Sequence, residues 1–338
     1  MLTDRFIRME YSESGKFEDK PTLGFLNRKT APVKFTQAAK GNSVTITTPA
    51  LTLVYHGGKF TAQSLVVTGK GSGAFKHWAP EMSNDGNLLG TIKSLDELGP
   101  TSLNCTENAN IKVHAETLHC TWGLISRAGW SIYDDSESPV LNEYGWWGEP
   151  SADKKTTTWL NNSDTQDWYG FFHGHDYKGA LSDYIKVGGK IPMVPKQALG
   201  VWWTRWFDFN NWDVLKIVDD YESRGLPLDV FVLDMDWHMK NGWTGWTFDK
   251  QLFPYPDDTL GYLKSRGLLT AANLHDALGV GNWDRQYEPL AKFIGEPDVQ
   301  DGQIQFSSCV NQKYAYGLED IVLGALEKQG LDFWWIDW

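Results

Sequence analysis

The stretch LDVFVLDMDWH, residues 228–238, decides the fold class that this chain predicts. It begins as a continuous apolar run of β-branched and aromatic residues, which is typical of a strand buried on both faces. It then ends in the acidic residues Asp234 and Asp236. The segments LLTAANLHD, residues 268–276, and LDFWWIDW, residues 331–338, repeat this pattern of an apolar run followed by polar or acidic side chains. We therefore expect three buried strands with polar ends.

Helical segments separate these strands along the chain. A further apolar strand is expected within LGVWWTRW, residues 199–206, and it comes first. The order from residue 199 onward is then β-α-β-α-β-α-β, which indicates a parallel sheet covered by helices. The expected helices lie in NNWDVLKIVDDYESRGLP, residues 210–227, in DDTLGYLKSRG, residues 257–267, and in YAYGLEDIVLGALEKQG, residues 314–330.

The turn after the first of these strands distinguishes between two parallel folds. A Rossmann sheet needs a glycine-rich phosphate turn at this place, but the chain has the bulky stretch RWFDFNNW at residues 205–212. In a (β/α)8 barrel, functional side chains lie where the strands end at the C-terminal face, which suits the polar strand ends of this sequence. We therefore predict that residues 191–338 form the first half of a (β/α)8 TIM barrel, truncated after its fourth strand.

Residues 1–190 have a different pattern. Short segments with period-two alternation, such as RFIRMEY, residues 5–11, and FTAQSLVVTG, residues 60–69, are separated by Gly, Asn, Asp and Pro. Regular short strands of this kind favour a β-sandwich domain. The proline-bearing segment KIPMVPKQALG, residues 190–200, is expected to be the linker between the two domains.

The composition argues against several classes of partner. The net charge is −12 without a block of basic residues, so no nucleic-acid partner is expected. The chain has no long apolar run and no apolar signal core after Met1, so we expect no membrane span and a cytoplasmic location.

Three cysteines make no disulfide framework, and Cys105 and Cys120 are expected to be buried thiols, although a pair between them stays open. The 18 tryptophans fit core packing or stacking on sugar rings equally well.

The carboxylates at the strand ends allow more than one interpretation. Asp337 is either a structural acid, capping or paired, or a nucleophile or general base in a cleft. Asp234 and Asp236 are two residues apart, so they face the same side only if the strand stays regular. They fit hydrogen bonds to sugar hydroxyls, a support of Asp234 by Asp236, or a metal ion, for which no third ligand stands at fixed spacing. His275 fits a hydrogen-bonded scaffold residue better than a catalyst.

Taken together, these features resemble glycoside hydrolase family 31, the family of retaining α-glucosidases and α-xylosidases. The family's second-strand pattern Asp-Ile-Asp-aromatic is matched by residues 234–237, and its nucleophile strand Trp-Ile-Asp-Met-Asn-Glu is matched by residues 335–337. The order and spacing of these motifs and the stretch WTGWTFDKQLFPYPD, residues 243–257, strengthen the resemblance. It implies a galactose-mutarotase-like fold for the sandwich domain and a carbohydrate ligand.

The resemblance also implies roles for single residues. Asp337 would be the nucleophile, and Asp234 would hold a hydroxyl of the sugar in the −1 subsite. Trp335 would line that subsite, and Trp206 stands where the family often has an aromatic residue after the first-strand arginine. No cofactor and no metal ion are implied. The remaining candidates for substrate binding are Arg205, Asp236 and His275.

The chain departs from the family pattern in three places. Trp338 follows Asp337 in place of Met, and residues 303–316, QIQFSSCVNQKYAY, lack the usual Phe-Pro-Asp or Asp-Pro pattern. The family's acid/base Asp, which lies on a later strand, has no counterpart. The sugar and the linkage therefore stay open.

These points lead to one main functional hypothesis. We expect hydrolysis of terminal α-linked glycosides by a retaining double displacement, while an elimination of the lyase type stays open. The isolated chain is expected to be a nearly inactive part of a longer product, or a subunit whose partner chain completes the barrel. The alternatives are a non-catalytic carbohydrate-binding fragment or subunit and, in a third class, a structural protein.

Overall fold

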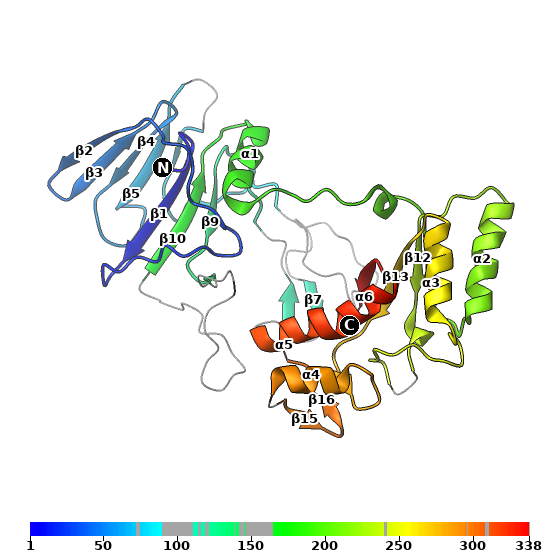
Figure 1. The fold of residues 1–338 in the computed structure, drawn as a ribbon. Helices are drawn as coiled ribbons and strands as arrows, with labels where there is room; N and C mark the ends of the chain where they lie inside the picture. Colours follow the sequence, from blue (N-terminus) through cyan, green and yellow to red (C-terminus); the bar gives the residue numbers. More distant parts are fainter. Residues whose placement is uncertain are drawn as a thin grey trace. The chain divides into compact units, whose positions relative to one another are not determined.

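The computed structural model of the chain divides into two compact units (Figure 1). The first comprises Met1–Glu149 and Thr158–Ile191, and the second contains Pro192–Trp338. The three cysteines, and with them the possible Cys105–Cys120 pair, lie outside the described residues. The residues that the structure describes are 1–71, 75–89, 111–113, 116–118, 122–138, 140–141, 146, 165–239, 242–295, 297–307 and 311–337.

The first unit is a β-sandwich, as predicted. One antiparallel sheet has the strand order β2-β3-β4-β5-β6, and the other has the order β1-β10-β9. Leu53 and Val67 of the first sheet join Ile7 and Met9 of the second in one buried cluster, because alternate side chains of a strand face the same side. The strands are β1 Phe6–Ser12, β2 Thr36–Lys40, β3 Ser43–Thr47, β4 Leu51–Tyr55, β5 Leu65–Gly69, β6 His77–Trp78, β9 Ser131–Asp134 and β10 Thr165–Phe171.

The other face of the β1-β10-β9 sheet is covered by helix α1 (Tyr177–Gly188). Phe6 and Phe171 pack with Val187 of the helix in a separate buried cluster. The helix begins after Asp176, whose carboxylate accepts a hydrogen bond from the Gly179 amide. A further antiparallel pair consists of β7 (Ile111–Val113) and β8 (Glu116–Leu118).

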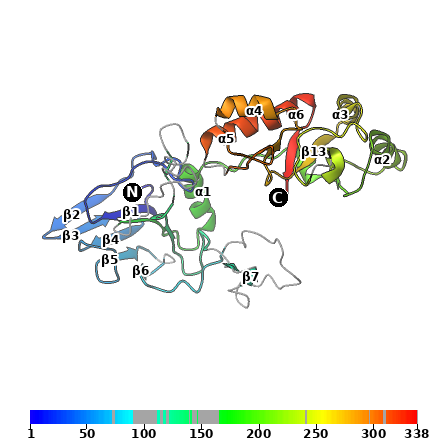
Figure 2. The same ribbon diagram turned by 90° about the horizontal axis from the view of Figure 1, so that it is seen from below.

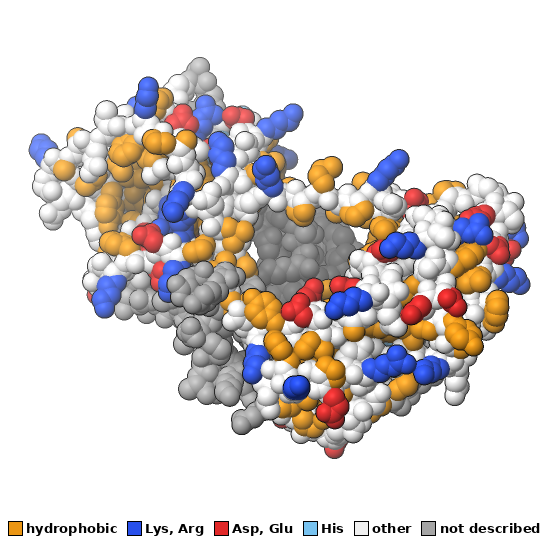
Figure 3. Space-filling model, in the orientation of Figure 1, with side chains coloured by type: hydrophobic (Ala, Val, Ile, Leu, Met, Phe, Trp, Pro, Cys, Tyr) orange, Lys and Arg blue, Asp and Glu red, His pale blue; other side chains and the backbone are white. Residues whose placement is uncertain are grey.

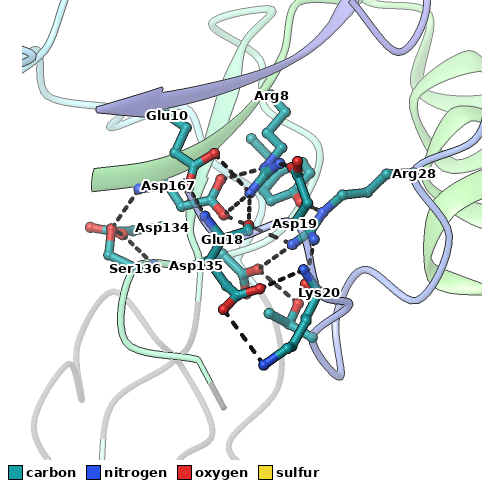
Figure 4. Close-up of polar contacts among 12 residues, drawn as sticks. Arg8, Glu10, Glu18, Asp19, Lys20, Arg28, Asp134, Asp135, Ser136 and Asp167 are labelled. Carbon is teal, nitrogen blue, oxygen red and sulfur yellow. Dashed lines mark hydrogen bonds and ion pairs between the residues drawn. The ribbon is translucent and has the colours of Figure 1, made fainter. Parts of the chain in front are cut away.

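Charged side chains gather on this outer face of the same sheet (Figure 4). The guanidinium of Arg8 donates to both carboxylate oxygens of Asp167, at 2.9 and 2.8 Å, and its Nη2 lies 3.1 Å from Glu10. Arg28 lies 3.9 Å from the fully buried carboxylate of Asp135. Burial raises the pKa of Asp135 and, in the same way, the pKa of Glu10. The two arginines therefore neutralise carboxylates that would otherwise be buried without a counter-charge.

The second unit is built on a four-stranded parallel sheet with the order β11-β12-β13-β17. Figures 1 and 2 show α2 and α3 side by side, and α4, α5 and α6 grouped together. A π-helix, η3, joins α5 to α6. The strands are β11 Trp202–Trp203, β12 Val230–Leu233, β13 Leu269–Leu274 and β17 Phe333–Ile336; the helices are α2 Asn211–Ser223, α3 Pro256–Ser265, α4 Tyr287–Ile294, α5 Gln312–Gly317, η3 Leu318–Leu323 and α6 Gly324–Gln329.

The two faces of this sheet carry different clusters. Phe231 and Leu233 of β12 face the helices and pack with Val218 of α2 in the largest buried cluster. Val230 and Val232 point the other way and pack with the inner side chains of β13 and β17. On this inner face the ring of Trp202, from edge strand β11, meets the ring of Phe333, from edge strand β17, with centroids 5.3 Å apart. Contact between the two edge strands shows that the sheet is curved as in a barrel.

Several elements differ from the expected ones. The strand expected within residues 199–206 is reduced to two residues, preceded by the 3-10 turn η1 (Lys196–Leu199). The strand expected over residues 228–238 ends at Leu233, and a 3-10 turn, η2 (Met235–Trp237), follows. Asp234 caps this turn with its own carboxylate, which is the physical reason why the strand stops there. The predicted helix over 314–330 forms, but the π-helix interrupts it.

The loop after β13 forms a small antiparallel sheet of its own, from β14 (Val280–Gly281), β16 (Gln303–Ile304) and β15 (Val299–Gln300). On the face drawn in Figure 3, the basic side chains of the described residues are spread between acidic and hydrophobic ones. Among the described residues, no helix is both long and apolar enough to cross a bilayer.

Candidate active site

The polar strand ends come together at the C-terminal edge of the parallel sheet. Strand register places Asn273 of β13 beside Trp335 of β17, and Leu233 of β12 beside Ala272. Because side chains alternate, Asn273 shares the inner face of the sheet with Asp337, which lies two residues beyond Trp335. The sequence pattern and the parallel register together therefore build one polar site from three adjacent strands.

The side chain of Asn273 connects two carboxylates. Its Nδ2 donates to Asp234 Oδ1 at 2.9 Å and to Asp337 Oδ2 at 3.1 Å. Asn273 is only 4% exposed, and its backbone carbonyl accepts a hydrogen bond from the Trp237 indole at 2.9 Å. The Asp337 amide in turn donates to the Leu274 carbonyl at 3.1 Å, which extends the strand pairing up to the carboxylate. Both aspartates are thus fixed from the same buried strand.

His275 is the second donor to Asp337. Its Nε2 lies 3.0 Å from Asp337 Oδ2, and the imidazole is buried while the Asp337 side chain is 49% exposed. The hydrogen bond from His275 lowers the pKa of Asp337, burial opposes this, and the bond from Asn273 lowers it further. Asp337 is therefore held as an ionised carboxylate with one side open, which is the state that a nucleophile needs.

Asp236 does not share the position of Asp234. The sequence required a regular strand for both to face the same side, and this condition is not met, because the chain turns into the 3-10 conformation at Met235. Asp234 instead accepts from the Met235 amide at 2.8 Å and from Asn273. Both aspartates still line one small hollow of about 10 Å³, together with Arg205. The side chain of Arg205 packs over Phe207, with Cζ 5.5 Å from the ring centroid.

The two predicted tryptophans lie in different surroundings. Trp335 is half-buried on the inner face of the sheet, beside Val232 and Ala271. Trp206 is exposed on the segment after β11, where its ring centroid lies 6.2 Å from that of Trp243.

Sequence reasoning gave no individual role to two residues of this site, Asn273 and Trp243. Strand alternation could have found Asn273, because it stands two positions before His275. The position of Trp243 over His275, at a centroid distance of 5.6 Å, depends on a loop conformation that no local pattern reveals.

The donor set of this site does not suggest a metal centre. Among the residues that the structure describes, no group of three or more His, Cys, Asp or Glu side chains could hold a metal ion. Asp234 and Asp337 are each engaged by the amide of Asn273, which donates hydrogen bonds and so competes with a cation. The arrangement suits the recognition of hydroxyl groups next to a nucleophilic carboxylate.

Comparison with known proteins agrees with this architecture. Residues 191–338 match the model of the glycosyl hydrolases family 31 TIM-barrel domain. An alpha-xylosidase of Saccharolobus solfataricus is 28% identical over 125 residues, which are 37% of this chain and 17% of that protein. Alpha-glucosidase 2 of Bacillus thermoamyloliquefaciens is 33% identical over 102 residues, which are 30% of this chain and 13% of that protein. The predicted resemblance to glycoside hydrolase family 31 is therefore confirmed.

Solved structures extend the likeness in fold to both units. The GH31 alpha-xylosidase from Xanthomonas citri superposes with a TM-score of 0.63 at 14% identity, covering 100% of this chain and 55% of that one. A Flavobacterium johnsoniae GH31 dextranase complexed with glucose gives a TM-score of 0.64 at 15% identity, covering 100% and 44%. The chain thus spans about half the length of these structures, and it has the β-sandwich and part of the TIM barrel.

Proposed function

We propose that this chain carries the nucleophile half of a retaining α-glycosidase site, with Asp337 as the nucleophile. The observation that carries the proposal is the pair of hydrogen bonds from Asn273 and His275 to Asp337 Oδ2. They favour the ionised carboxylate and fix its direction toward the inner face of the barrel half. The family match supports glycoside hydrolysis as the reaction class.

The two oxygens of Asp337 have different tasks in this mechanism. Both hydrogen bonds end on Oδ2, so Oδ1 is the oxygen that reaches the anomeric carbon. A bond forms between Oδ1 and this carbon while the bond to the leaving oxygen breaks, and the electron pair stays on that oxygen. Water then attacks the glycosyl ester, the Oδ1–carbon bond breaks, and the sugar leaves with the configuration it had at the start.

Asp234 is the proposed hydrogen-bond acceptor for a hydroxyl of the bound sugar. Asn273 and the Met235 amide both donate to Oδ1 of Asp234, so its Oδ2 is the oxygen directed to a ligand. Trp335, on the inner face next to Asp337, is the proposed wall behind this sugar. Asp236 and Arg205 line the neighbouring hollow and are proposed contacts for more distant hydroxyls.

A second carboxylic acid must protonate the leaving oxygen and later take a proton from water. Asp234 is assigned to binding, so the proposal places this acid on a further β/α unit of the barrel. Parallel strands β11 and β17 each pair on one side only within the described residues, so four more strands would pair with both edges. Residues of a longer chain or of a partner chain would supply them.

Trapping of the glycosyl ester tests this function without the acid. Fluoride leaves an anomeric carbon without protonation, so the 5-fluoro derivatives of α-glucosyl and α-xylosyl fluoride need only the nucleophile. Mass spectrometry of the full chain should find one added glycosyl unit, and peptide mapping should place it on Asp337. Asp337→Asn should show no adduct, while Asp332→Asn, at the opposite end of the same strand, should be labelled like the wild type.

Four outcomes separate the hypotheses. An adduct on Asp337 supports the glycosidase. Sugar binding by calorimetry without any adduct would favour the non-catalytic carbohydrate-binding protein instead. An adduct on a different carboxylate, or neither binding nor labelling, would refute the role of Asp337.

A further inference from the structure

A pocket of about 330 Å³ lies on the helix-covered side of the parallel sheet. It is lined by the loop after β12, by the start of α3, and by Arg285 and Gln286, which precede α4. Phe253, a lining residue that is only 2% exposed, belongs to the largest buried cluster, between the sheet and its helices. Trp335, near Asp337, packs on the opposite face of the sheet. The pocket is therefore separate from the site around Asp337.

The charged side chains that line the pocket balance each other. Lys250 and Arg285 carry two positive charges, Asp257 and Asp258 carry two negative charges, and all four residues are exposed. The nitrogen atoms donate hydrogen bonds and the carboxylates accept them. A charged ligand would be attracted by one pair and repelled by the other. The lining therefore favours a neutral ligand with groups that both donate and accept.

Gln286 adds a buried acceptor to the pocket. Its Nε2 donates to the Trp246 carbonyl at 2.9 Å, which fixes the amide. The residue is 7% exposed, and its Oε1 is buried without a hydrogen-bond donor among the described residues. A buried acceptor left unpaired costs about 1–3 kcal/mol, so a ligand hydroxyl that pairs with Oε1 is favoured. No side chain caps the N-terminus of α3, and the amides of its first turn are further donors.

Tyr255 supplies an aromatic surface beside these polar groups. It lines the pocket, comes directly before α3, and is 68% exposed. An aromatic ring offers a large apolar face at a low cost in conformational entropy. A pyranose ring has C–H groups on its face and hydroxyls around its edge, so it complements one aromatic ring next to donors and acceptors. The volume lies near the lower end of the range for ligand pockets, roughly 300–1,000 Å³, which suits a single sugar ring.

Backbone and side-chain hydrogen bonds hold the loop after β12 in place. The Trp246 amide donates to Asp284 Oδ1 at 3.0 Å, and the Asp249 amide donates to the Trp237 carbonyl at 3.0 Å. The Phe253 amide donates to the Asp249 carbonyl at 2.7 Å. The pocket is thus formed before a ligand arrives, which lowers the cost of binding.

We propose that this pocket is a non-catalytic carbohydrate site that binds one neutral pyranose ring of a glycan. Tyr255 stacks on the C–H face of the ring, Gln286 Oε1 accepts a hydrogen bond from one hydroxyl, and the charged side chains pair with the others. This binding does not depend on Asp337, so it goes beyond the function proposed above and persists in a chain without activity.

Hydrogen exchange followed by mass spectrometry tests the proposal on the full chain. Maltotriose and isomaltotriose at millimolar concentrations are the neutral probes, and inorganic phosphate is the anionic probe. Either sugar should slow exchange in peptides that cover residues 246–258 and 284–287. The effect should be the same in Asp337→Asn, which separates this binding from binding at the proposed nucleophile.

Three tyrosine variants examine the stacking contact. Tyr255→Ala should raise the Kd from the exchange titration about three- to tenfold, which is the effect of one lost ring contact. Tyr255→Phe keeps the ring and should bind like the wild type. Tyr316→Ala, at a tyrosine of α5 that is 45% exposed, is the matched control and should leave the Kd unchanged.

Several results would overturn the proposal. Protection that is absent, or confined to peptides around Asn273 and Asp337, would exclude a separate sugar site. Protection by phosphate but not by the sugars would make the pocket an anion site instead. An unchanged Kd in Tyr255→Ala, or an equal loss in Tyr316→Ala, would refute the contact with Tyr255. None of these results bears on the labelling of Asp337, so the two proposals fail independently.

Discussion

Asp234 and Asp337 share one hydrogen-bond donor, the Nδ2 of Asn273, at 2.9 and 3.1 Å. One buried amide thus sets the separation of a proposed sugar-binding carboxylate and a proposed nucleophile that are more than a hundred residues apart in the chain. The orientation of both groups depends on β13, the strand between the two strands that carry them. This dependence has consequences that can be measured.

Asn273→Ala should weaken both the fold and the site. The substitution removes a buried donor from two carboxylates, and such a loss costs about 1–3 kcal/mol of unfolding free energy. Urea unfolding should show the loss, and trapping of Asp337 by 5-fluoro-glycosyl fluoride should slow. Asn27→Ala, which removes an exposed amide that donates to the Lys186 carbonyl, is the control. Unchanged labelling in Asn273→Ala would contradict the role of Asn273.

His275→Ala should move the acid limb of Asp337 labelling to higher pH. The bond from His275 lowers the pKa of Asp337, so without it this pKa rises toward its ordinary value. Labelling requires the ionised carboxylate, so the labelling rate falls as the pH falls through the pKa of Asp337. In the variant this decline begins at a higher pH. His77→Ala, at an exposed histidine, is the control. His275→Gln keeps a hydrogen-bond donor, so its pH profile should lie between the profiles of His275→Ala and the wild type. Coincident profiles would disprove the coupling.

Asp183→Asn should destabilise the first unit in a pH-dependent way. Burial opposes ionisation of Asp183, but bonds from His173 at 2.9 Å, Lys186 at 2.7 Å and Thr3 at 2.6 Å hold its pKa well below the usual range. The resulting stability, about 1–3 kcal/mol, is present above the unfolded-state pKa and is lost as the pH falls through the lower folded-state pKa.

The measurement for Asp183→Asn is the urea-unfolding midpoint of variant and wild type between neutral pH and the acid range. The difference should be largest near neutrality and should shrink on acidification. The exposed Glu13→Gln, in the same unit, should show no comparable difference. A difference that grows toward acid pH would mean that the sign of the linkage is wrong.

Arg8→Met should be among the most damaging changes in the β-sandwich. The arginine is mostly buried and pairs with Asp167 and Glu10, so its removal leaves carboxylates without a counter-charge (Figure 4). Breaking a buried pair in this way costs about 3–5 kcal/mol. Thermal unfolding should show the loss, and the triple variant with Asp167→Asn and Glu10→Gln should recover part of it. Full destabilisation in the triple variant would show that lost packing, not charge, is responsible.

The fold of the second unit was predictable because its signals are local. Apolar runs, the helical stretches between them and the cap of α2 at Asn210 lie within single elements, and the structure has a strand or helix in each of these places. The prediction of one regular strand over residues 228–238 was wrong. The strand before Asp234 ends early because the Asp234 carboxylate accepts a hydrogen bond from the Met235 amide. The end of the strand thus depends on a single side chain.

The sequence by itself determined the β-sandwich, the parallel strands and the polar residues at their ends, since alternation, apolar runs and turn residues act over a few neighbouring positions. Only the tertiary structure decided that Asn273 joins Asp234 to Asp337, that the chain enters a 3-10 turn between Asp234 and Asp236, and that Trp243 lies on His275. These relationships join strands and loops far apart in the chain. They depend on strand register and on how the sheet curves, and no short stretch of residues encodes either.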